Sequence, residues 1–330
     1  MTVQDEAAPA ASAAPAPQPA PRSGRAALMT WLRRALLVLV LAAAGWALYS
    51  HWGGVSKTLV TVPWHSTVLS QLAVVLGITA GTLGWQTIVD GLGKPIGAFR
   101  GAQIMLVGSL GKYVPGSVWA YLLQMELGRQ AGLPRARVFT ATLINLGVGV
   151  VASLLLGVLA LPVMMSSTPG LMWLYLLLPI GLIALHPKVL TWGASLVLKV
   201  LKKAPLDHVL PWSTVGRSLG YALLSYVLFG VHLWLLSISS GPVSVRVLLL
   251  CAGAVAIGMT VGLIAFILPS GAGVRELVLV SALSTTMPVE QALAFTLVSR
   301  LMFTVADIAM AGGAAGLARW QLSKNKPVDA

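Results

Sequence analysis

Two short segments, residues 111–119 and 268–276, combine proline, glycine and charged side chains inside otherwise apolar stretches. Proline and glycine end helices, and backbone N–H and C=O groups freed at membrane depth need protein or water as partners. In transporters, broken helices of this kind line the substrate cavity. The two segments therefore predict a binding site for a transported molecule.

In the first segment, Lys112 is the candidate for binding an anion. Pro115 lacks an N–H group and Gly116 permits close approach of a ligand to the backbone, while Tyr113 could line the same cavity. An ammonium group held at this depth would neutralise a phosphate. The alternative is a lysine whose long side chain reaches back to the membrane surface.

In the second segment, Gly271 and Gly273 follow Pro269 and precede Arg275 and Glu276. If a helix starts here, its free N–H groups and dipole point into the membrane and favour an anion. Arg275 could make a bidentate contact with phosphate or carboxylate. Glu276 would either hold the arginine in place or titrate.

Further charged residues could extend a polar path through the protein. Glu126 and Arg129 are three residues apart and share a helix face, which also suits a plain surface ion pair. Arg300 and Asp307 are seven residues apart in the last apolar stretch, hence on one face and about 10 Å apart along a helix axis. Asp307 could couple transport to protons, or both residues could pair with other helices.

The remaining candidate residues favour packing over chemistry. His232 lies in an apolar stretch, where it is expected to pack rather than to bind a ligand. Cys251 is the only cysteine, which excludes an intramolecular disulfide and a cysteine-based metal cluster. We find no metal-ligand spacing, nucleotide-binding phosphate loop or Ser/His/Asp set, and we expect no enzyme activity, cofactor or metal.

The composition decides the class of protein that must position these residues. The chain is 57% hydrophobic and 9% charged, whereas soluble proteins carry about a quarter charged residues. Its apolar runs predict an all-α, polytopic membrane protein with about six full spans and two broken, re-entrant hairpins. The first span follows Arg33 and Arg34 and ends near Trp52, with a twin-arginine or cleaved signal as the alternative. The other spans are expected at 66–90, 138–161, 170–186, 218–240 and 292–318, and the broken stretches at 96–128 and 246–287.

The flanking segments and the charges set the expected domains and topology. Residues 1–27, rich in alanine and proline, should be a disordered tail before a transmembrane domain at 28–320, and residues 321–330 form a second tail. The net charge of +13 comes from Lys and Arg in short loops, which indicates membrane orientation rather than nucleic-acid binding. Only Lys57 and Arg246 lie in loops opposite the termini, so both termini should be cytoplasmic and the protein should lie in the cytoplasmic membrane.

A weak internal repeat at an offset of 154 residues aligns Pro115 with Pro269 and Pro134 with Pro288. The repeat halves would be 66–161 and 218–315, and the single extra crossing between them would give the halves opposite orientations. A helix, a broken hairpin and a helix, repeated upside down, is a known plan of transporters.

The motifs Lys-Tyr-x-Pro-Gly-x-x-Trp at 112–119 and Pro-x-Gly-x-Gly-Val-Arg-Glu at 269–276 resemble those of the flippase-like membrane domain family. That family includes the membrane region of lysylphosphatidylglycerol synthases, and the resemblance covers roughly residues 30–320. Many members carry a Glu-Arg pair in the span after the first hairpin, where this chain has Ile144, Asn145 and Leu146. The aminoacyl-transfer domain is absent, so the resemblance implies lipid translocation rather than lysine transfer.

Three functions follow from these observations. The first is a flippase for a phospholipid or an isoprenoid-linked sugar lipid, with the headgroup held between the two broken hairpins. The second is a membrane partner or scaffold for a glycosyltransferase of envelope biosynthesis. The third, a membrane transferase, has no catalytic residues to support it.

Overall fold

In the computed structural model, all regular secondary structure in the described residues is helical. The structure describes residue 49 and residues 52–113, 118–165, 174–200, 209–238, 244–264 and 271–324. Several predictions lie outside the described residues: the tail at 1–27, most of the first span, and the three break residues Pro115, Gly116 and Pro269.

Five helices in the described part of the chain are long and apolar enough to cross a membrane. They are α3 (Trp64–Gly91), α6 (Arg135–Met165), α9 (Trp212–Ser237), α10 (Val245–Ile264) and α12 (Val289–Lys324). Shorter helices are α2 (Trp52–Thr61), α4 (Ala98–Ala102), α5 (Val118–Gln130), α7 (Leu174–Ala184), α8 (Pro187–Val200) and α11 (Val274–Leu283). A polytopic helical membrane protein was predicted, and this is confirmed.

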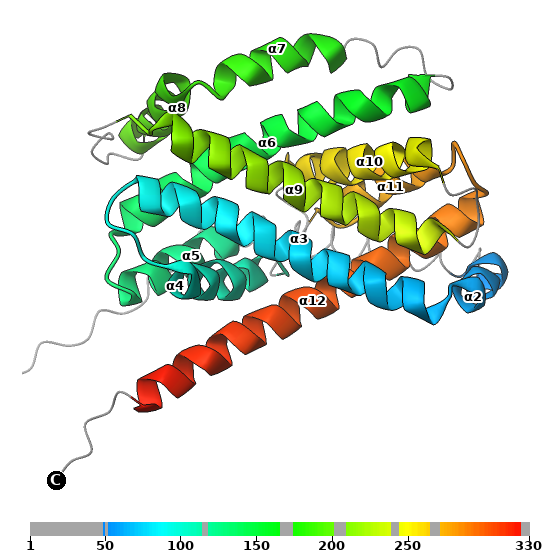
Figure 1. Ribbon diagram of the computed structural model, residues 1–330, viewed down its shortest axis with the longest axis horizontal. Helices are drawn as coiled ribbons and strands as arrows, with labels where there is room; N and C mark the ends of the chain where they lie inside the picture. The colour runs from blue at the N-terminus through cyan, green and yellow to red at the C-terminus, as the bar shows by residue number, and fades with distance from the viewer. Residues whose placement is uncertain are drawn as a thin grey trace, which may run out of the picture.

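The helices α3 and α9 run side by side through the middle of the protein (Figure 1). Small residues allow the close contact, since Gly77 faces the ring of Phe229 and its carbonyl accepts a 2.8 Å hydrogen bond from Ser225 Oγ. His232 on α9 lies 2.6 Å from Ser70 Oγ on α3 and 2.8 Å from Ser299 Oγ on α12. This buried histidine joins three helices, which is a packing role.

Two helical hairpins lie toward opposite ends of this frame (Figure 1). The first consists of α4, which continues through a π-helical turn at Gln103–Val107 to a 3-10 turn at Leu110–Tyr113, and of α5. The second consists of α10 and α11. Their placement suits the inverted repeat, which itself stays a prediction.

The second broken stretch differs from the first in the lengths of its arms. Its first arm, α10, has 20 residues and is apolar enough to cross a membrane, whereas α11 has only 10. By its length and composition, α10 could therefore cross the membrane, whereas the sequence suggested that it is part of a re-entrant hairpin. Hydropathy cannot make this distinction because residues 247–264 contain no charged residue up to the break.

Glycines allow the two arms of each hairpin to touch. A Cβ atom on Gly111 would lie 2.5 Å from the backbone nitrogen of Ala120, in the other arm of the first hairpin. At the second hairpin, a Cβ atom on Gly271 would lie 2.5 Å from Cα of Gly262, and Gly271 has φ +64°. Both breaks thus depend on backbone-to-backbone approach that a side chain would block.

Replacing Gly271 with alanine is expected to lower the free energy of unfolding by about 2 kcal/mol or more. Alanine is strained in the left-handed backbone conformation of this residue, and its Cβ atom would also clash with Gly262. Thermal unfolding in detergent, followed by size-exclusion chromatography, measures the change. Gly312→Ala on α12 is the matched control, since nothing lies within 4 Å of a Cβ there. An unchanged melting temperature for Gly271→Ala would contradict the tight turn.

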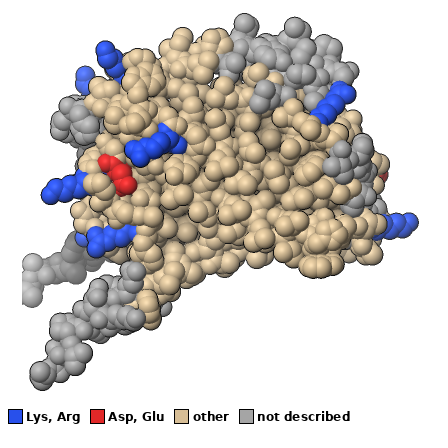
Figure 2. Space-filling view, in the orientation of Figure 1, with Lys and Arg blue, Asp and Glu red and all other residues tan. Residues whose placement is uncertain are grey.

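Charged side chains on the face drawn in Figure 2 lie toward its two ends, and the space between them is uncharged. The larger group of Lys and Arg lies at the end that also holds α8 and the C-terminal end of α12 (Figures 1 and 2). An uncharged belt between charged ends is typical of a membrane protein.

We predict that Ser56 is outside the cell and Ser23 inside. In a Cys251→Ala background, a cysteine at Ser56 should react with an impermeant maleimide on intact cells. A cysteine at Ser23 should react only after permeabilisation. Cys251 is fully buried in the described core, so its replacement by a residue of similar size is a mild change. The reverse labelling pattern would contradict the topology.

Candidate functional site

A cavity of about 340 Å³ lies between the two hairpins. Residues beside both breaks line it, Lys112 and Tyr113 from the first and Gly271 and Arg275 from the second. The helices α5, α6, α9, α10 and α12 supply the other walls. The structure therefore brings the two sequence motifs, more than 150 residues apart, to one site.

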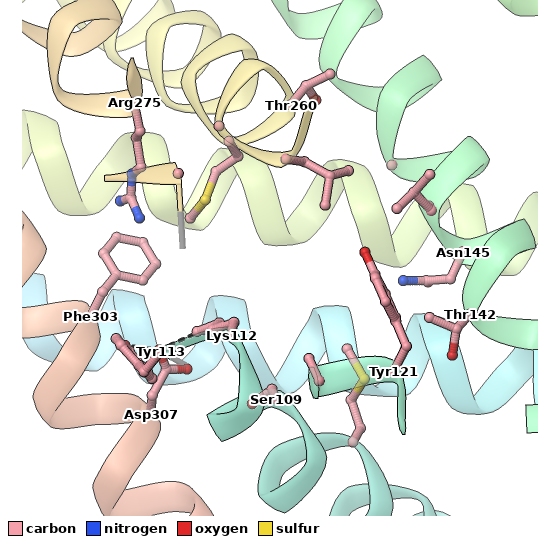
Figure 3. A pocket seen from close by; sticks show the side chains of 18 of the residues that line it. Ser109, Lys112, Tyr113, Tyr121, Thr142, Asn145, Thr260, Arg275, Phe303 and Asp307 are labelled. Carbon is pink, nitrogen blue, oxygen red and sulfur yellow. Dashed lines mark hydrogen bonds and ion pairs between the residues drawn. The ribbon is translucent and has the colours of Figure 1, made fainter. Parts of the chain in front are cut away.

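Lys112 binds a carboxylate in this cavity. Its Nζ lies 2.6 Å from Asp307 Oδ2, and the hydroxyl of Tyr113 donates a 2.6 Å hydrogen bond to the same oxygen (Figure 3). The Asp307 side chain is only 4% exposed, while that of Lys112 is 33% exposed. Lys112 thus points into the protein instead of reaching the membrane surface, and its charge is matched.

A second ion pair joins α12 to the other hairpin. Arg300 Nη1 donates to Glu276 Oε1 at 2.9 Å, and Glu276 Oε2 accepts from the backbone N–H of Gly273 at 2.7 Å. Glu276 therefore caps the start of α11 while it holds Arg300. Arg300 and Asp307 share α12 as predicted, but each binds a different hairpin.

Arg275 is buried without such a partner. Its side chain is 5% exposed, and its Nε and Nη2 atoms have no hydrogen-bond partner among the described residues. Its guanidinium carbon lies 4.3 Å from the centre of the Phe303 ring, which holds the group in the cavity wall (Figure 3). A buried guanidinium with unsatisfied N–H groups is costly, and an anion would supply what it lacks.

The charges of this cluster do not cancel. Three cations, Lys112, Arg275 and Arg300, stand against two carboxylates, Asp307 and Glu276. One positive charge is therefore not balanced. Arg275 carries it, and this is the residue whose Nε and Nη2 atoms lack hydrogen-bond partners. The cluster therefore has a net positive charge, which favours a negatively charged group over a cation.

Residues 31–310 match the family of lysylphosphatidylglycerol synthase TM regions. The chain belongs to this family. The match covers the two hairpins and every residue of the charged cluster, and it confirms the resemblance that the two motifs predicted. No curated protein matches the chain.

In this member of the lysylphosphatidylglycerol synthase TM family, Glu126 and Arg129 do not line the cavity. Glu126 lies at the surface and accepts hydrogen bonds of 2.6 Å from Arg129 and Arg135. These bonds lower the pKa of its carboxyl to about 2. A part in the polar path is thus not supported for this pair, because its charges are satisfied outside, and the surface ion pair is the better interpretation.

Sequence reasoning missed several polar and aromatic residues of the cavity. They are Tyr121, Thr142, Asn145, Tyr226, Thr260 and Phe303. Asn145 carried the clearest signal, since it is the only asparagine or aspartate in the apolar run 138–161. Phe303 carried no signal, because an aromatic residue in an apolar helix is ordinary.

Proposed function

We propose that this protein moves a phosphate-bearing lipid across the cytoplasmic membrane, with the headgroup in the cavity and the tails in the surrounding lipid. The observation that carries the proposal is Arg275, a buried cation that lacks hydrogen-bond partners in the described part of the chain. Membership in a family named for enzymes of a membrane phospholipid supports a lipid-related role. The cargo is either a phospholipid or an isoprenoid-linked sugar, since both carry phosphate.

The guanidinium of Arg275 would bind the phosphate through its Nε and Nη2 N–H groups, which lie on one edge of the planar group and suit two phosphate oxygens. Stacking on Phe303 keeps that edge in place before the headgroup arrives. Lys112 would become a second contact when its ion pair with Asp307 opens. Asp307 would then still accept a hydrogen bond from Tyr113, so the carboxylate would keep one hydrogen-bond donor.

A transporting role accounts for the cavity better than a scaffolding role does. A protein that only anchors a glycosyltransferase has no use for an unpaired arginine at this depth, and the desolvated charge would lower its stability. The cavity's volume of about 340 Å³ falls within the range of small-molecule sites, which is about 300–1,000 Å³. The cavity is therefore large enough for a phosphate headgroup.

Movement of labelled lipid in proteoliposomes tests the proposal. Fluorescent phosphatidylglycerol and a fluorescent isoprenyl phosphate sugar would be placed in both leaflets, and a membrane-impermeant reductant would bleach the outer one. In vesicles that contain the protein, the reductant should bleach more than the half of the label that starts in the outer leaflet, because inner-leaflet lipid moves outward. This is expected for at least one of the two lipids. Vesicles without protein set the baseline, and bleaching no greater than that baseline for both lipids would overturn the proposal.

A further inference from the structure

The cavity has a second end that carries no charge. Tyr121, Thr142 and Asn145 lie on the side opposite Arg275, Phe303 and Asp307 (Figure 3). Thr142 is satisfied within the protein, because its hydroxyl accepts from Trp85 Nε1 at 3.0 Å and can donate to Val138 O at 2.9 Å.

Two polar groups at this uncharged end are left for a ligand. The amide of Asn145 and the hydroxyl of Tyr121 have no hydrogen-bond partner among the described residues, and both line the cavity. The amide nitrogen of Asn145 points toward Tyr121 and the open space (Figure 3). Each group can both donate and accept, which matches a hydroxyl group on a ligand.

A cationic substituent would find no counter-ion in this cavity. Asp307 binds Lys112 and Tyr113, and Glu276 beside the cavity binds Arg300 and the N–H of Gly273. In the described part of the chain, no carboxylate at the site is unpaired. The cluster's net positive charge would also repel an ammonium group.

We propose that the cavity selects lipids whose phosphate carries an uncharged, hydroxyl-bearing substituent such as glycerol or a sugar. The phosphate binds at Arg275, and the substituent's hydroxyls bind Asn145 and Tyr121. Lipids with an ammonium headgroup are excluded. This selectivity rests on the proposed function, because it takes the Arg275 site as the phosphate site.

Binding of three lipids with identical acyl chains to the purified full-length protein tests the selectivity. The lipids are phosphatidylglycerol, phosphatidylethanolamine and phosphatidic acid, titrated in detergent with native mass spectrometry as the readout. Phosphatidylglycerol should bind at least about tenfold more tightly than phosphatidylethanolamine, since an unpaired charge and two lost hydrogen bonds separate them. Equal affinities for these two lipids would overturn the proposal.

Variants locate the selectivity at the two residues. Asn145→Leu and Tyr121→Phe should each weaken phosphatidylglycerol binding about 2- to 10-fold, which is the effect of losing one hydrogen bond. Neither should change the affinity for phosphatidic acid, which lacks the substituent. Tyr221→Phe, outside the residues that line the cavity, is the matched control. Asn145→Asp should shift the preference toward phosphatidylethanolamine by adding the missing carboxylate.

Arg275→Ala separates a failure of this inference from a failure of the proposed function. If Arg275→Ala weakens all three lipids but Tyr121→Phe and Asn145→Leu weaken phosphatidic acid as much as phosphatidylglycerol, only the selectivity is wrong. If Arg275→Ala leaves the binding of all three lipids unchanged, the phosphate site itself is wrong. Tyr121→Phe removes a single oxygen, so the test stands even if Asn145→Leu fails to fold.

Discussion

Replacing Arg275 with alanine is expected to slow lipid translocation about 10- to 150-fold, the equivalent of about 1.5–3 kcal/mol for a charge-assisted hydrogen bond. The protein should stay folded, because the described structure gives this side chain no hydrogen bond through Nε or Nη2 to lose. Removing a desolvated cation should leave the melting temperature equal or higher. The proteoliposome assay and thermal unfolding in detergent measure the two quantities on the same preparation.

Arg275→Lys is the informative companion to Arg275→Ala. Lysine keeps the charge but cannot reproduce two parallel N–H groups, so translocation should remain impaired. Arg246→Ala, which changes an exposed arginine at the start of α10, is the matched control and should move lipid at the wild-type rate. Wild-type translocation by Arg275→Ala would show that the arginine has a structural role only.

Replacing Lys112 with alanine is expected to destabilise the fold as well as to slow translocation. The change strips the buried carboxylate of Asp307 of its counter-ion. We expect a loss of about 3 kcal/mol, the low end for a broken buried pair, since the Lys112 side chain is 33% exposed.

The double variant Lys112→Met/Asp307→Asn separates the two effects. With both charges gone, no unpaired carboxylate remains, so most of the lost stability should return. Translocation should stay slow, because the second phosphate contact is still missing. Glu126→Gln breaks an ion pair at the surface and should leave the stability nearly unchanged. If the double variant is no more stable than Lys112→Ala, or moves lipid at the wild-type rate, this account of the pair is wrong.

The two ion pairs give α12 a particular place in the mechanism. Asp307 pairs with Lys112 of the first hairpin, and Arg300 pairs with Glu276 of the second. Asp307 and Arg300 are about two helical turns apart on α12. A headgroup that attracts Lys112 away from Asp307 would break the first ion pair and leave the second intact. In the proposed function, binding of cargo would thereby change the contact between α12 and the first hairpin.

Much of the fold could be predicted from hydropathy alone. The expected spans at 66–90, 138–161, 218–240 and 292–318 correspond to α3, α6, α9 and α12, because about 20 apolar residues have one stable form in lipid. The break at 268–276 was marked by Pro269 and the glycines that follow it. The length of α10 could not be predicted, because nothing in its composition marks where the hairpin begins.

The charged residues of the site were predictable from the sequence, but the way in which they pair was not. Lys112, Arg275, Arg300 and Asp307 stood out as charges in apolar surroundings, where each needs a partner. Their pairing depends on how α12 packs between two hairpins, and only tertiary structure fixes that. Local reasoning therefore assigned Lys112 and Arg275 equal roles, whereas in the structure the lysine is paired and the arginine is the residue that lacks hydrogen-bond partners.

Photocrosslinking inside the cavity tests most directly whether a lipid phosphate occupies it. A photoreactive amino acid in place of Met259, which lines the cavity, would be activated in native membranes and any adduct identified by mass spectrometry. The same residue in place of the exposed Leu72 on α3 reports ordinary contact with the bilayer. We predict a phosphate-bearing lipid adduct at position 259 that Arg275→Ala abolishes, while the adduct at position 72 persists. No lipid adduct at position 259, or one that Arg275→Ala leaves unchanged, would contradict the account.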